Sequence, residues 1–286
     1  MFRKMARGVL TLALLLVWGA QSLAGPRIVC PPEPIKIGFF EFGVLFSVER
    51  KDWQRKGFGI DRDLAQELEK RSGCRFEGHL MSRARIWTEL QEGRLDMTLS
   101  AIKTPEREAI AWMIPYSVSQ QVILMSARVP IGERSEPMFL ANRERKFAAV
   151  RGFRHAPYHD AILDRLRGEG RVVDAVDETQ LFDMLKTGVA DAIIAQHSLY
   201  ASYLDQHALG KTVHVLQWNP KPELTVAHLL LLRKSFSAVE AEQWRALLEE
   251  IRRDGTALAL ALRYFDRDAA HRMQLPKNLE VSRFAP

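Results

Sequence analysis

A basic residue lies where a helix start disfavours one. In the segment SAIKTPERE, which begins at Ser100, Thr104 suits the cap, Pro105 suits the first helical position, and Glu106 suits the positive end of the helix dipole. Arg107 is a cation in the same turn, at a cost of about 0.3 kcal/mol. Its planar guanidinium can grip a carboxylate through two parallel hydrogen bonds. The segment alone fits either a surface arginine or an anion-binding one.

Other residue patterns that could carry chemistry are weaker. His155 and His159 have the spacing of two metal ligands on a helix. Neither a cysteine nor an acid of a familiar metal motif accompanies them, and the same spacing is found on solvated helix faces. The sequence has no zinc-protease, serine-hydrolase or phosphate-loop motif. It therefore predicts no catalytic residue, metal or cofactor.

Two cysteines, Cys30 and Cys74, precede predicted strands at 35–40 and 75–80. If these strands are parallel neighbours, both thiols lie at one edge of the sheet. Cysteines so placed in an oxidising compartment form a disulfide. The alternative is a pair of buried free thiols. We expect the disulfide.

The first residues have the pattern of a cleavable signal peptide. Basic residues precede an apolar stretch at 9–18, which is short for a membrane span, and the small residues Ser22 and Ala24 suit a signal peptidase. We expect a signal peptide over 1–24 and a periplasmic protein; the alternative is an uncleaved anchor. The formal charge of +6, with scattered basic residues, gives no case for a nucleic-acid partner.

Strands and helices alternate in two runs along the chain. The first run predicts strands at 35–40, 75–80 and 95–102, and helices at 59–73 and 82–93, with a further helix beginning within 104–113. The second predicts strands at 146–153, 171–176 and 189–196, and helices at 156–170 and 178–188. This order is typical of sheets with parallel strands that are flanked by helices.

One short motif occurs in both runs. Residues 90–96 and 185–191 both read L-x-x-G-x-x-D before an apolar strand, which fits a last helical turn, a glycine cap and a tight loop. An apolar stretch at 120–129 lies between the runs and another at 225–234 follows the second run; they predict a crossing from lobe one to lobe two and a crossing back. We expect an α/β fold of two lobes, with lobe one at 25–120 and 226–286 and lobe two at 121–225.

The ordered set of motifs resembles the bacterial extracellular solute-binding proteins of family 3, the polar amino-acid type. The resemblance rests on GFGIDRDLAQELEKRSG, W-x-x-L-x-x-G-x-x-D at Trp87–Asp96, TPERE, LKTGVADAII and DGTALALALRYF, in this order. It implies two α/β lobes, each with a mainly parallel sheet, and a ligand cleft that closes by hinge motion. It further implies a monomer that serves an ABC-transporter permease.

The resemblance also implies ligand-binding positions. Arg107 matches the arginine that holds the ligand α-carboxylate. The stretch before it is one residue shorter than usual, which keeps Ser100 and brings Lys103 near the gap. Arg154 stands in a lobe-two loop that usually carries small hydroxyl residues. Gln196 takes the place of the acid that pairs with an α-amino group.

These departures favour an acidic ligand over a zwitterion, because a buried ammonium needs an anionic partner. The alternative is that Arg154 points to solvent and Glu41 replaces the missing acid. Phe40 is a candidate apolar wall of the cleft, although strand alternation also allows it a core position. Arg85 begins a helix and suits either the cleft or solvent.

Two other functions remain open. Cyclohexadienyl dehydratases resemble this family and act on a ring with two carboxylates, so an acid such as Glu41 or Glu178 could serve an enzyme. A periplasmic sensor or an interaction module is the other alternative. A lone desolvated carboxylic acid beside a ring-sized pocket would favour the enzyme.

Overall fold

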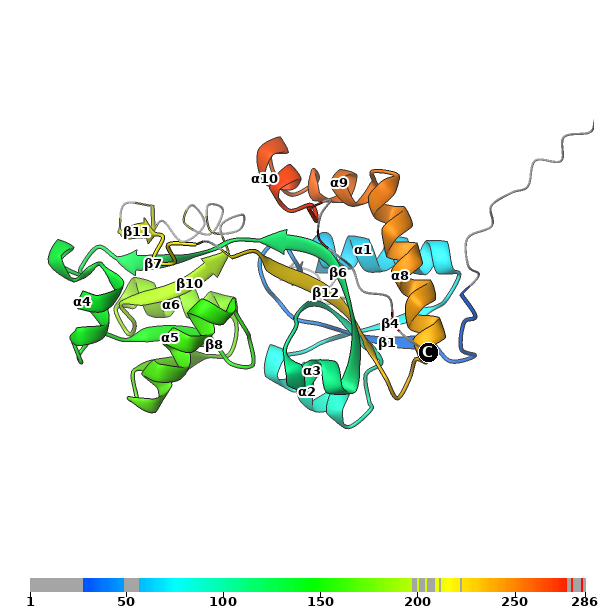
Figure 1. The fold of residues 1–286 in the computed structure, drawn as a ribbon, viewed down its shortest axis with the longest axis horizontal. Coiled ribbons are helices and arrows are strands. Elements are labelled where there is room, and N and C mark those ends of the chain that lie inside the picture. The colour runs from blue at the N-terminus through cyan, green and yellow to red at the C-terminus, as the bar shows by residue number, and fades with distance from the viewer. Residues whose placement is uncertain are drawn as a thin grey trace, which may run out of the picture.

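The protein consists of two lobes that are joined by two crossings of the chain (Figure 1). The structure is a computed structural model that describes residues 28–48, 57–196, 200, 204, 209–210, 212–221, 223–276, 279 and 284. Each lobe is built on a five-stranded sheet. We call the lobe that contains the first strand lobe one and the other lobe two.

The sheet of lobe one has the strand order β4-β1-β5-β12-β6. Its strands are β1 (Ile35–Phe39), β4 (Phe76–Leu80), β5 (Met97–Ile102), β6 (Ala111–Ser119) and β12 (Thr225–Leu232). β4, β1 and β5 are parallel, and β12 runs antiparallel to both of its neighbours. Between β1 and α1 in the sequence, β2 (Ser47–Val48) and β3 (Gly57–Phe58) form a separate two-stranded antiparallel sheet.

The sheet of lobe two repeats this topology with the order β11-β7-β10-β8-β9. Its strands are β7 (Gln121–Ser126), β8 (Phe147–Val150), β9 (Val172–Ala175), β10 (Ala192–Gln196) and β11 (Val213–Leu216). β9, β8 and β10 are parallel, and β7 is antiparallel to both of its neighbours. The expected sheets are therefore confirmed as mixed sheets, each with a parallel half.

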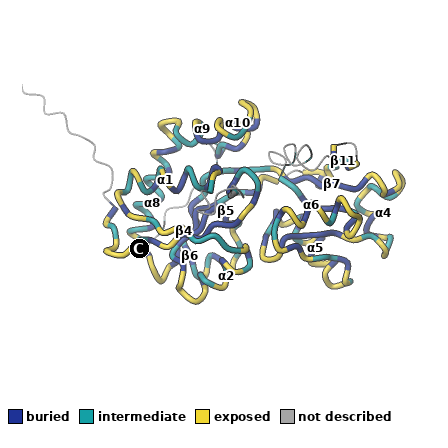
Figure 2. The backbone as a smooth tube through the Cα atoms, turned by 180° about the vertical axis from the view of Figure 1, so that it is seen from behind, coloured by how far each residue is buried: buried dark blue, intermediate teal, exposed yellow. Residues whose placement is uncertain are grey.

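Helices cover the sheets of both lobes, with exposed residues gathered on the helices and loops and buried ones on the strands (Figure 2). Lobe one has α1 (Ile60–Ser72), α2 (Arg83–Gln91), α3 (Pro105–Ile110), α8 (Ala238–Arg253), α9 (Thr256–Ala261) and α10 (Arg267–Arg272). Lobe two has a 3₁₀ turn at Ile131–Glu133 and the helices α4 (Glu136–Ala141), α5 (Pro157–Gly168) and α6 (Glu178–Thr187). No helix in these ranges has the length and hydropathy for a membrane crossing.

The crossings join strands that lie in different sheets. β6 leads into β7 through Gln120 alone, and the chain returns between β11 and β12 (Figure 1). The helix expected to begin within 104–113 ends at Ile110, because Ala111 starts a strand that pairs with β12 along its full length. The lobe limits 25–120, 121–225 and 226–286 stay predictions, and the expected signal peptide lies outside the described residues.

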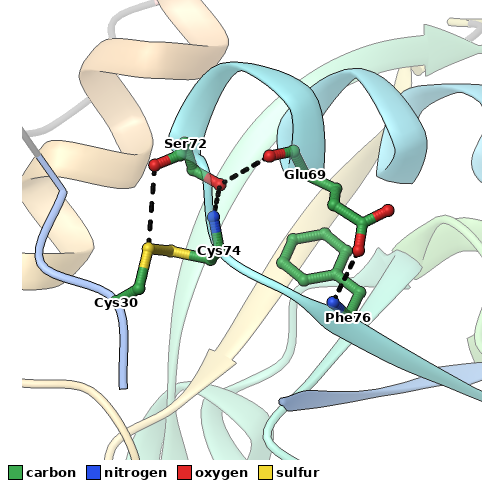
Figure 3. Close-up of a disulfide and its surroundings, with 5 residues drawn as sticks. All are labelled: Cys30, Glu69, Ser72, Cys74 and Phe76. Atoms are coloured by element: carbon green, nitrogen blue, oxygen red, sulfur yellow. Dashed lines mark hydrogen bonds between the residues drawn. A yellow bond between two sulfur atoms is a disulfide. The ribbon is translucent and has the colours of Figure 1, made fainter. Parts of the chain in front are cut away.

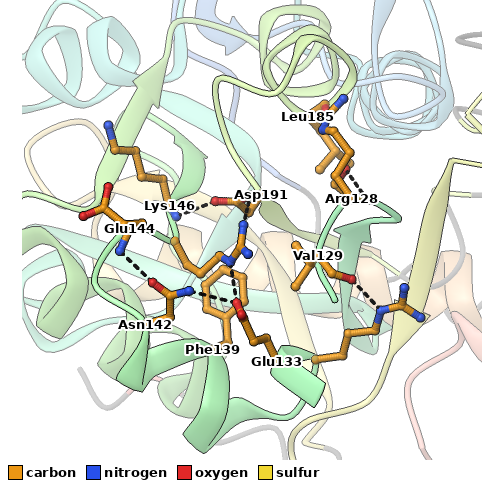
Figure 4. Close-up of polar contacts among 12 residues, drawn as sticks. Arg128, Val129, Glu133, Phe139, Asn142, Glu144, Lys146, Leu185 and Asp191 are labelled. Carbon is orange, nitrogen blue, oxygen red and sulfur yellow. Dashed lines mark hydrogen bonds and ion pairs between the residues drawn. The ribbon is translucent and has the colours of Figure 1, made fainter. Parts of the chain in front are cut away.

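The repeated motif forms the same joint in both lobes. Gly93 and Gly188 both have positive φ, of 74° and 88°, which lets the chain turn from a helix towards the next strand. In lobe two the Asp191 carboxylate accepts the Lys146 backbone N–H at 2.9 Å (Figure 4). This joint fixes where a parallel strand begins, and so where it ends at the cleft.

The expected disulfide between Cys30 and Cys74 is present (Figure 3). β1 and β4 are parallel neighbours, with Ile35 opposite Phe76, so both cysteines lie at one edge of the sheet. The Cys74 backbone N–H donates to the Ser72 hydroxyl at 3.1 Å just after α1. The bond thus ties the segment before β1 to the end of α1.

Candidate functional site

Arg107 lies at the start of α3 in the geometry that the sequence predicts. The Thr104 hydroxyl caps the helix and accepts the Arg107 N–H at 3.3 Å, and Pro105 occupies the first helical position. The Arg107 side chain turns away from the helix axis and is buried, with 9% of the residue exposed. Its guanidinium donates to the Ile102 carbonyl at 2.7 Å. The side chain is therefore not a surface arginine.

The same guanidinium reaches across to lobe two. It donates to the Gly152 carbonyl at 3.2 Å, and the Trp87 indole N–H donates to that carbonyl at 3.1 Å. Gly152 follows β8, at the carboxyl end of the parallel strands, where open α/β sheets bind ligands. One backbone oxygen of lobe two thus accepts from two side chains of lobe one.

A second buried arginine lies beside the first. The Arg83 guanidinium carbon is 4.4 Å from the centre of the Phe40 ring and 5.0 Å from that of Trp87, whereas the Arg107 carbon is 3.7 Å from Trp87. Arg83 donates to the Ser100 carbonyl at 2.9 Å, and its Nε has no partner among the described residues. The two guanidinium groups therefore flank a shared aromatic ring.

This arrangement concentrates positive charge. Burial, followed by repulsion from Arg83 and Arg154, lowers the pKa of Arg107 to about 9. Burial lowers the pKa of Arg83 to about 10, against the attraction of Asp61. Both groups are still cations at neutral pH. Neither forms an ion pair with a carboxylate in the described part of the chain, so an anion placed between them would be stabilised.

Aromatic side chains from both lobes surround the same point. The Phe153 ring of lobe two stacks on the Phe42 ring of lobe one, with centres 5.1 Å apart and planes 12° apart. Phe40 meets the edge of Phe153 at 6.4 Å and lies 5.9 Å from Phe42. These three buried rings belong to one hydrophobic cluster, and Phe40 contacts Arg83. The role of Phe40 as a wall of the ligand cleft stays a prediction.

Ser100 faces a buried carboxyl group. Its hydroxyl donates to Asp61 at 2.7 Å, and the Tyr116 hydroxyl donates to the other Asp61 oxygen at 2.8 Å. Ser100 has a φ of 51°, the one positive φ among the described residues other than glycine. Burial raises the pKa of Asp61 to about 6, although both hydrogen bonds and Arg83 favour the ionised form. Asp61 thus attracts Arg83, whereas the acids that act on Arg107 are Asp160 and Glu106.

Gln196 ends β10 and lines two small cavities. One, of about 20 Å³, is also bordered by Asp61, Ser100 and Tyr116. The other, of about 10 Å³, is bordered by apolar and neutral groups that include Phe42 and Phe153. The structure thus places Ser100 and Gln196 together at one end of the site.

The remaining basic candidates form ion pairs with acids. Lys103 lies 2.5 Å from Glu108, and its side chain is 53% exposed. Arg154 is half-buried, 3.7 Å from Asp160 and 3.8 Å from Asp164. Their charges are therefore balanced, unlike those of Arg83 and Arg107.

Arg85 and Glu41 are the two candidates on the surface. The Arg85 side chain is 68% exposed and pairs with Glu89 one helical turn along α2 at 3.2 Å. Glu41 follows β1 and is exposed. Neither side chain lies with the buried arginine pair.

A groove of about 880 Å³ lies beside the turn of α3 that carries Arg107. The starts of α3 and α5 and the crossing strands β6 and β12 line it, and its lining includes Lys103, Arg154 and Asp160. Arg107 is not among its described lining residues. The groove therefore lies beside the first turn of α3, while the Arg107 side chain is bonded to the Gly152 carbonyl.

Both histidines are buried rather than solvated, and only His159 lies in α5, since His155 precedes the helix. His155 contacts the Gln121 amide at 3.1 Å, and both ring nitrogens of His159 lack a described partner. Burial lowers the pKa of His155 to about 3 and that of His159 to about 4. The described histidines, cysteines and acids form no group that could hold a metal ion.

Gly152, Phe153 and Asp61 contribute to the site although no pattern in the sequence predicted a function for them. The tight turn after β8 was visible as a glycine after an apolar strand, but its contact with Arg107 depends on how the lobes approach. Asp61 and Asp63 lie in the first turn of α1, where acids are common because they favour the positive end of the helix dipole. Two aspartates two residues apart in that turn, of which only one can face out, were the available signal.

Two lobes of matching topology, two crossing strands and a buried arginine at their interface define the fold of a hinged binding protein. The chain belongs to the bacterial extracellular solute-binding proteins, family 3, whose sequence profile matches residues 35–267. No curated protein matches the sequence.

Solved structures support the fold. The substrate-binding protein of an amino-acid ABC transporter superposes with a TM-score of 0.65 at 19% identity, over 82% of this chain and 99% of that one. The arginine-, lysine- and histidine-binding protein ArtJ of Geobacillus stearothermophilus gives 0.66 at 18%, over 82% and 95%. The ancestral amino-acid-binding protein AncCDT-1, a precursor of cyclohexadienyl dehydratase, gives 0.65 at 19%, over 82% and 95%.

Proposed function

We propose that this protein is a periplasmic receptor that captures a small carboxylate-bearing solute between its lobes and delivers it to an ABC importer. The observation that carries the proposal is Arg107, which is buried, stacked on Trp87 and bonded only to neutral carbonyls among the described residues. A carboxylate in place of the Gly152 carbonyl would form a stronger, charge-assisted hydrogen bond. Arg83 adds to the attraction.

Several features support the importer and the compartment. Family 3 proteins are extracellular, the disulfide suits an oxidising compartment, and the N-terminal pattern is that of a signal peptide. Relatives of the same fold are named as binding proteins of amino-acid ABC transporters. We propose a monomer, with the permease as its protein partner.

The site gives less support to an enzyme. Asp61 is a desolvated acid, as a catalytic group would be, and its pKa is raised to about 6. Its two oxygens already accept hydrogen bonds from Ser100 and Tyr116. The cavity beside it, at about 20 Å³, has room for a water but not for a ring. We therefore retain a binding protein as the proposal.

A thermal-shift panel of monocarboxylates, dicarboxylates and amino acids tests the proposal. A ligand at a hundred times its dissociation constant adds about 2.7 kcal/mol to the free energy of unfolding. Arg107→Ala should abolish the shift, because it removes the anion-binding group. Arg253→Ala, on the exposed end of α8 and 70% exposed, is the matched control and should leave the shift intact. A shift that survives Arg107→Ala would contradict the proposal.

A further inference from the structure

The site on lobe one is occupied by a piece of lobe two. Gly152 presents its carbonyl oxygen to Arg107 and Trp87, at 3.2 and 3.1 Å. The next residue, Phe153, lays its ring on Phe42. An oxygen acceptor and a phenyl ring from two successive residues therefore fill two adjoining parts of one site.

The covalent spacing of these two groups defines a chemical outline. Three atoms, the Phe153 nitrogen, Cα and Cβ, separate the Gly152 carbonyl carbon from the Phe153 ring. The same spacing separates the carboxyl carbon from the ring in 4-phenylbutanoate. A molecule of this outline could make the contacts with Arg107, Trp87 and Phe42 that the chain makes itself.

The insertion is close-fitting and needs a glycine. Gly152 has a φ of 78°, and a Cβ on it would lie 2.9 Å from the Ala84 Cα. Such a backbone approach excludes every other residue type unless the lobes shift. Because Gly152 and Phe153 both belong to lobe two, opening of the crossing strands would withdraw them together and leave the lobe-one contacts free.

The charge around the ring part of the site is neutral. The small cavity beside Phe153 is lined by apolar side chains together with Gln121, His155 and Gln196, none of which is an acid that could neutralise an ammonium group. The nearby Asp160 carboxylate already accepts the His155 backbone N–H and pairs with Arg154. The excess charge lies instead at the oxygen part, on Arg83 and Arg107. A single negative charge at one end and an apolar ring at the other match this distribution.

We propose that the cleft binds an aryl-alkyl monocarboxylate, whose carboxylate replaces the Gly152 carbonyl on Arg107 and whose ring replaces Phe153 on Phe42. This inference rests on the proposed function, since it names the class of carboxylate that the receptor captures. The carboxylate gains a charge-assisted bond that the neutral carbonyl lacks. The ring keeps the offset stacking that the phenylalanine now supplies.

Isothermal titration of the purified protein with four matched probes tests the inference. We expect 4-phenylbutanoate to bind at least tenfold more tightly than butanoate, which lacks the ring, and glutarate, which has a second carboxylate instead. L-homophenylalanine is 4-phenylbutanoate with an α-ammonium group, and it should bind at least tenfold more weakly than 4-phenylbutanoate. Phe42→Leu should reduce the advantage over butanoate at least threefold, with thermal unfolding as the check on folding.

The outcomes separate this inference from the proposed function. Equal binding of butanoate, glutarate and 4-phenylbutanoate would overturn the aryl-alkyl class and leave carboxylate capture standing. Preferential binding of L-homophenylalanine would do the same, because it would require a partner for the ammonium. If none of the four probes, and no carboxylate of the wider panel, bound, both proposals would fall.

Discussion

The two lobes share one joint between helix and strand. In lobe one the Asp96 carboxylate accepts the Lys36 N–H at 2.8 Å, and in lobe two the Asp191 carboxylate accepts the Lys146 N–H at 2.9 Å. Lys36 is the second residue of β1, and Lys146 directly precedes β8. A seven-residue pattern thus sets the strand register by the same contact twice.

The lobes differ where their strands end at the cleft. Lobe one has two buried cations without a described carboxylate partner, Arg83 and Arg107. Lobe two has a half-buried cation, Arg154, that lies near two acids. The shared motif therefore determines the architecture of both lobes, whereas the loops after the strands determine which lobe attracts an anion.

The largest expected effect on stability comes from removing the disulfide bond of lobe one. Cys30 and Cys74 close a loop of lobe one, with a sequence separation of 44, and the described part of lobe two has no disulfide. Replacing both cysteines with serine should lower the free energy of unfolding by about 4 kcal/mol, because the unfolded chain regains loop entropy.

Hydrogen exchange of the double cysteine variant locates the effect. Amides of β1, β4 and α1 should exchange faster, and those of β8 and β10 should not. Reduction of the wild-type protein is the control and should reproduce the pattern. Equal loosening of both lobes would show that they unfold as one unit.

Much of this architecture could be predicted because local patterns determine it. Gly93 and Gly188 mark helix ends by their position alone, and the cysteine spacing placed both thiols before neighbouring strands. The strand character of β6 was missed, because residues 111–119 follow a helix start and gain their conformation from pairing with β12.

The site was harder to predict than the fold. A helix-start pattern singled out Arg107, but its contact with Gly152 depends on the distance between lobes, which no local pattern encodes. The pairing of Arg154 with Asp160 and Asp164 depends on how the loop after β8 folds back on α5. Contacts that depend on how the lobes approach or how a loop folds back therefore cannot be predicted from local sequence patterns.

The next effect is the response of each lobe to acid. The folded-state pKa of Asp61 in lobe one is raised from 3.8 to about 6, so its stabilising contribution is full below pH 3.8 and lost as the pH rises through 6. The pKa of His159 in lobe two is lowered from 6.5 to about 4, so its contribution is full above pH 6.5 and lost as the pH falls through 4.

Two substitutions should therefore change the acid response in opposite directions. As the pH falls from 6.5 to 4, the free energy of unfolding should decrease by on the order of 2 kcal/mol more in Asp61→Asn than in the wild type. In the wild type, protonation of Asp61 stabilises the fold over this range and partly compensates for the destabilising protonation of the histidines. His159→Gln should reduce the loss. His155 and His228 also have lowered pKa values and keep the net wild-type response a loss. Urea unfolding at the two pH values measures this, and parallel responses of the two variants would refute it.

The smallest effect on stability isolates the contact between the lobes. Gly152 and Gly170 both lie in lobe two with similar φ, 78° and 70°. A Cβ at Gly152 would meet the Ala84 backbone of lobe one, and a Cβ at Gly170 would meet no atom within 4 Å. Alanine at either position should cost about 1 kcal/mol for the left-handed conformation.

Only Gly152→Ala should also change the arrangement of the lobes. The added methyl group prevents the Gly152 carbonyl from reaching Arg107 and Trp87, so the unliganded protein should open about its crossing strands. Small-angle scattering should give a larger radius of gyration for this variant than for the wild type, and an unchanged one for Gly170→Ala. If the two variants gave the same radius of gyration, the contact at Gly152 would not determine closure, and another part of the interface would hold the two lobes together.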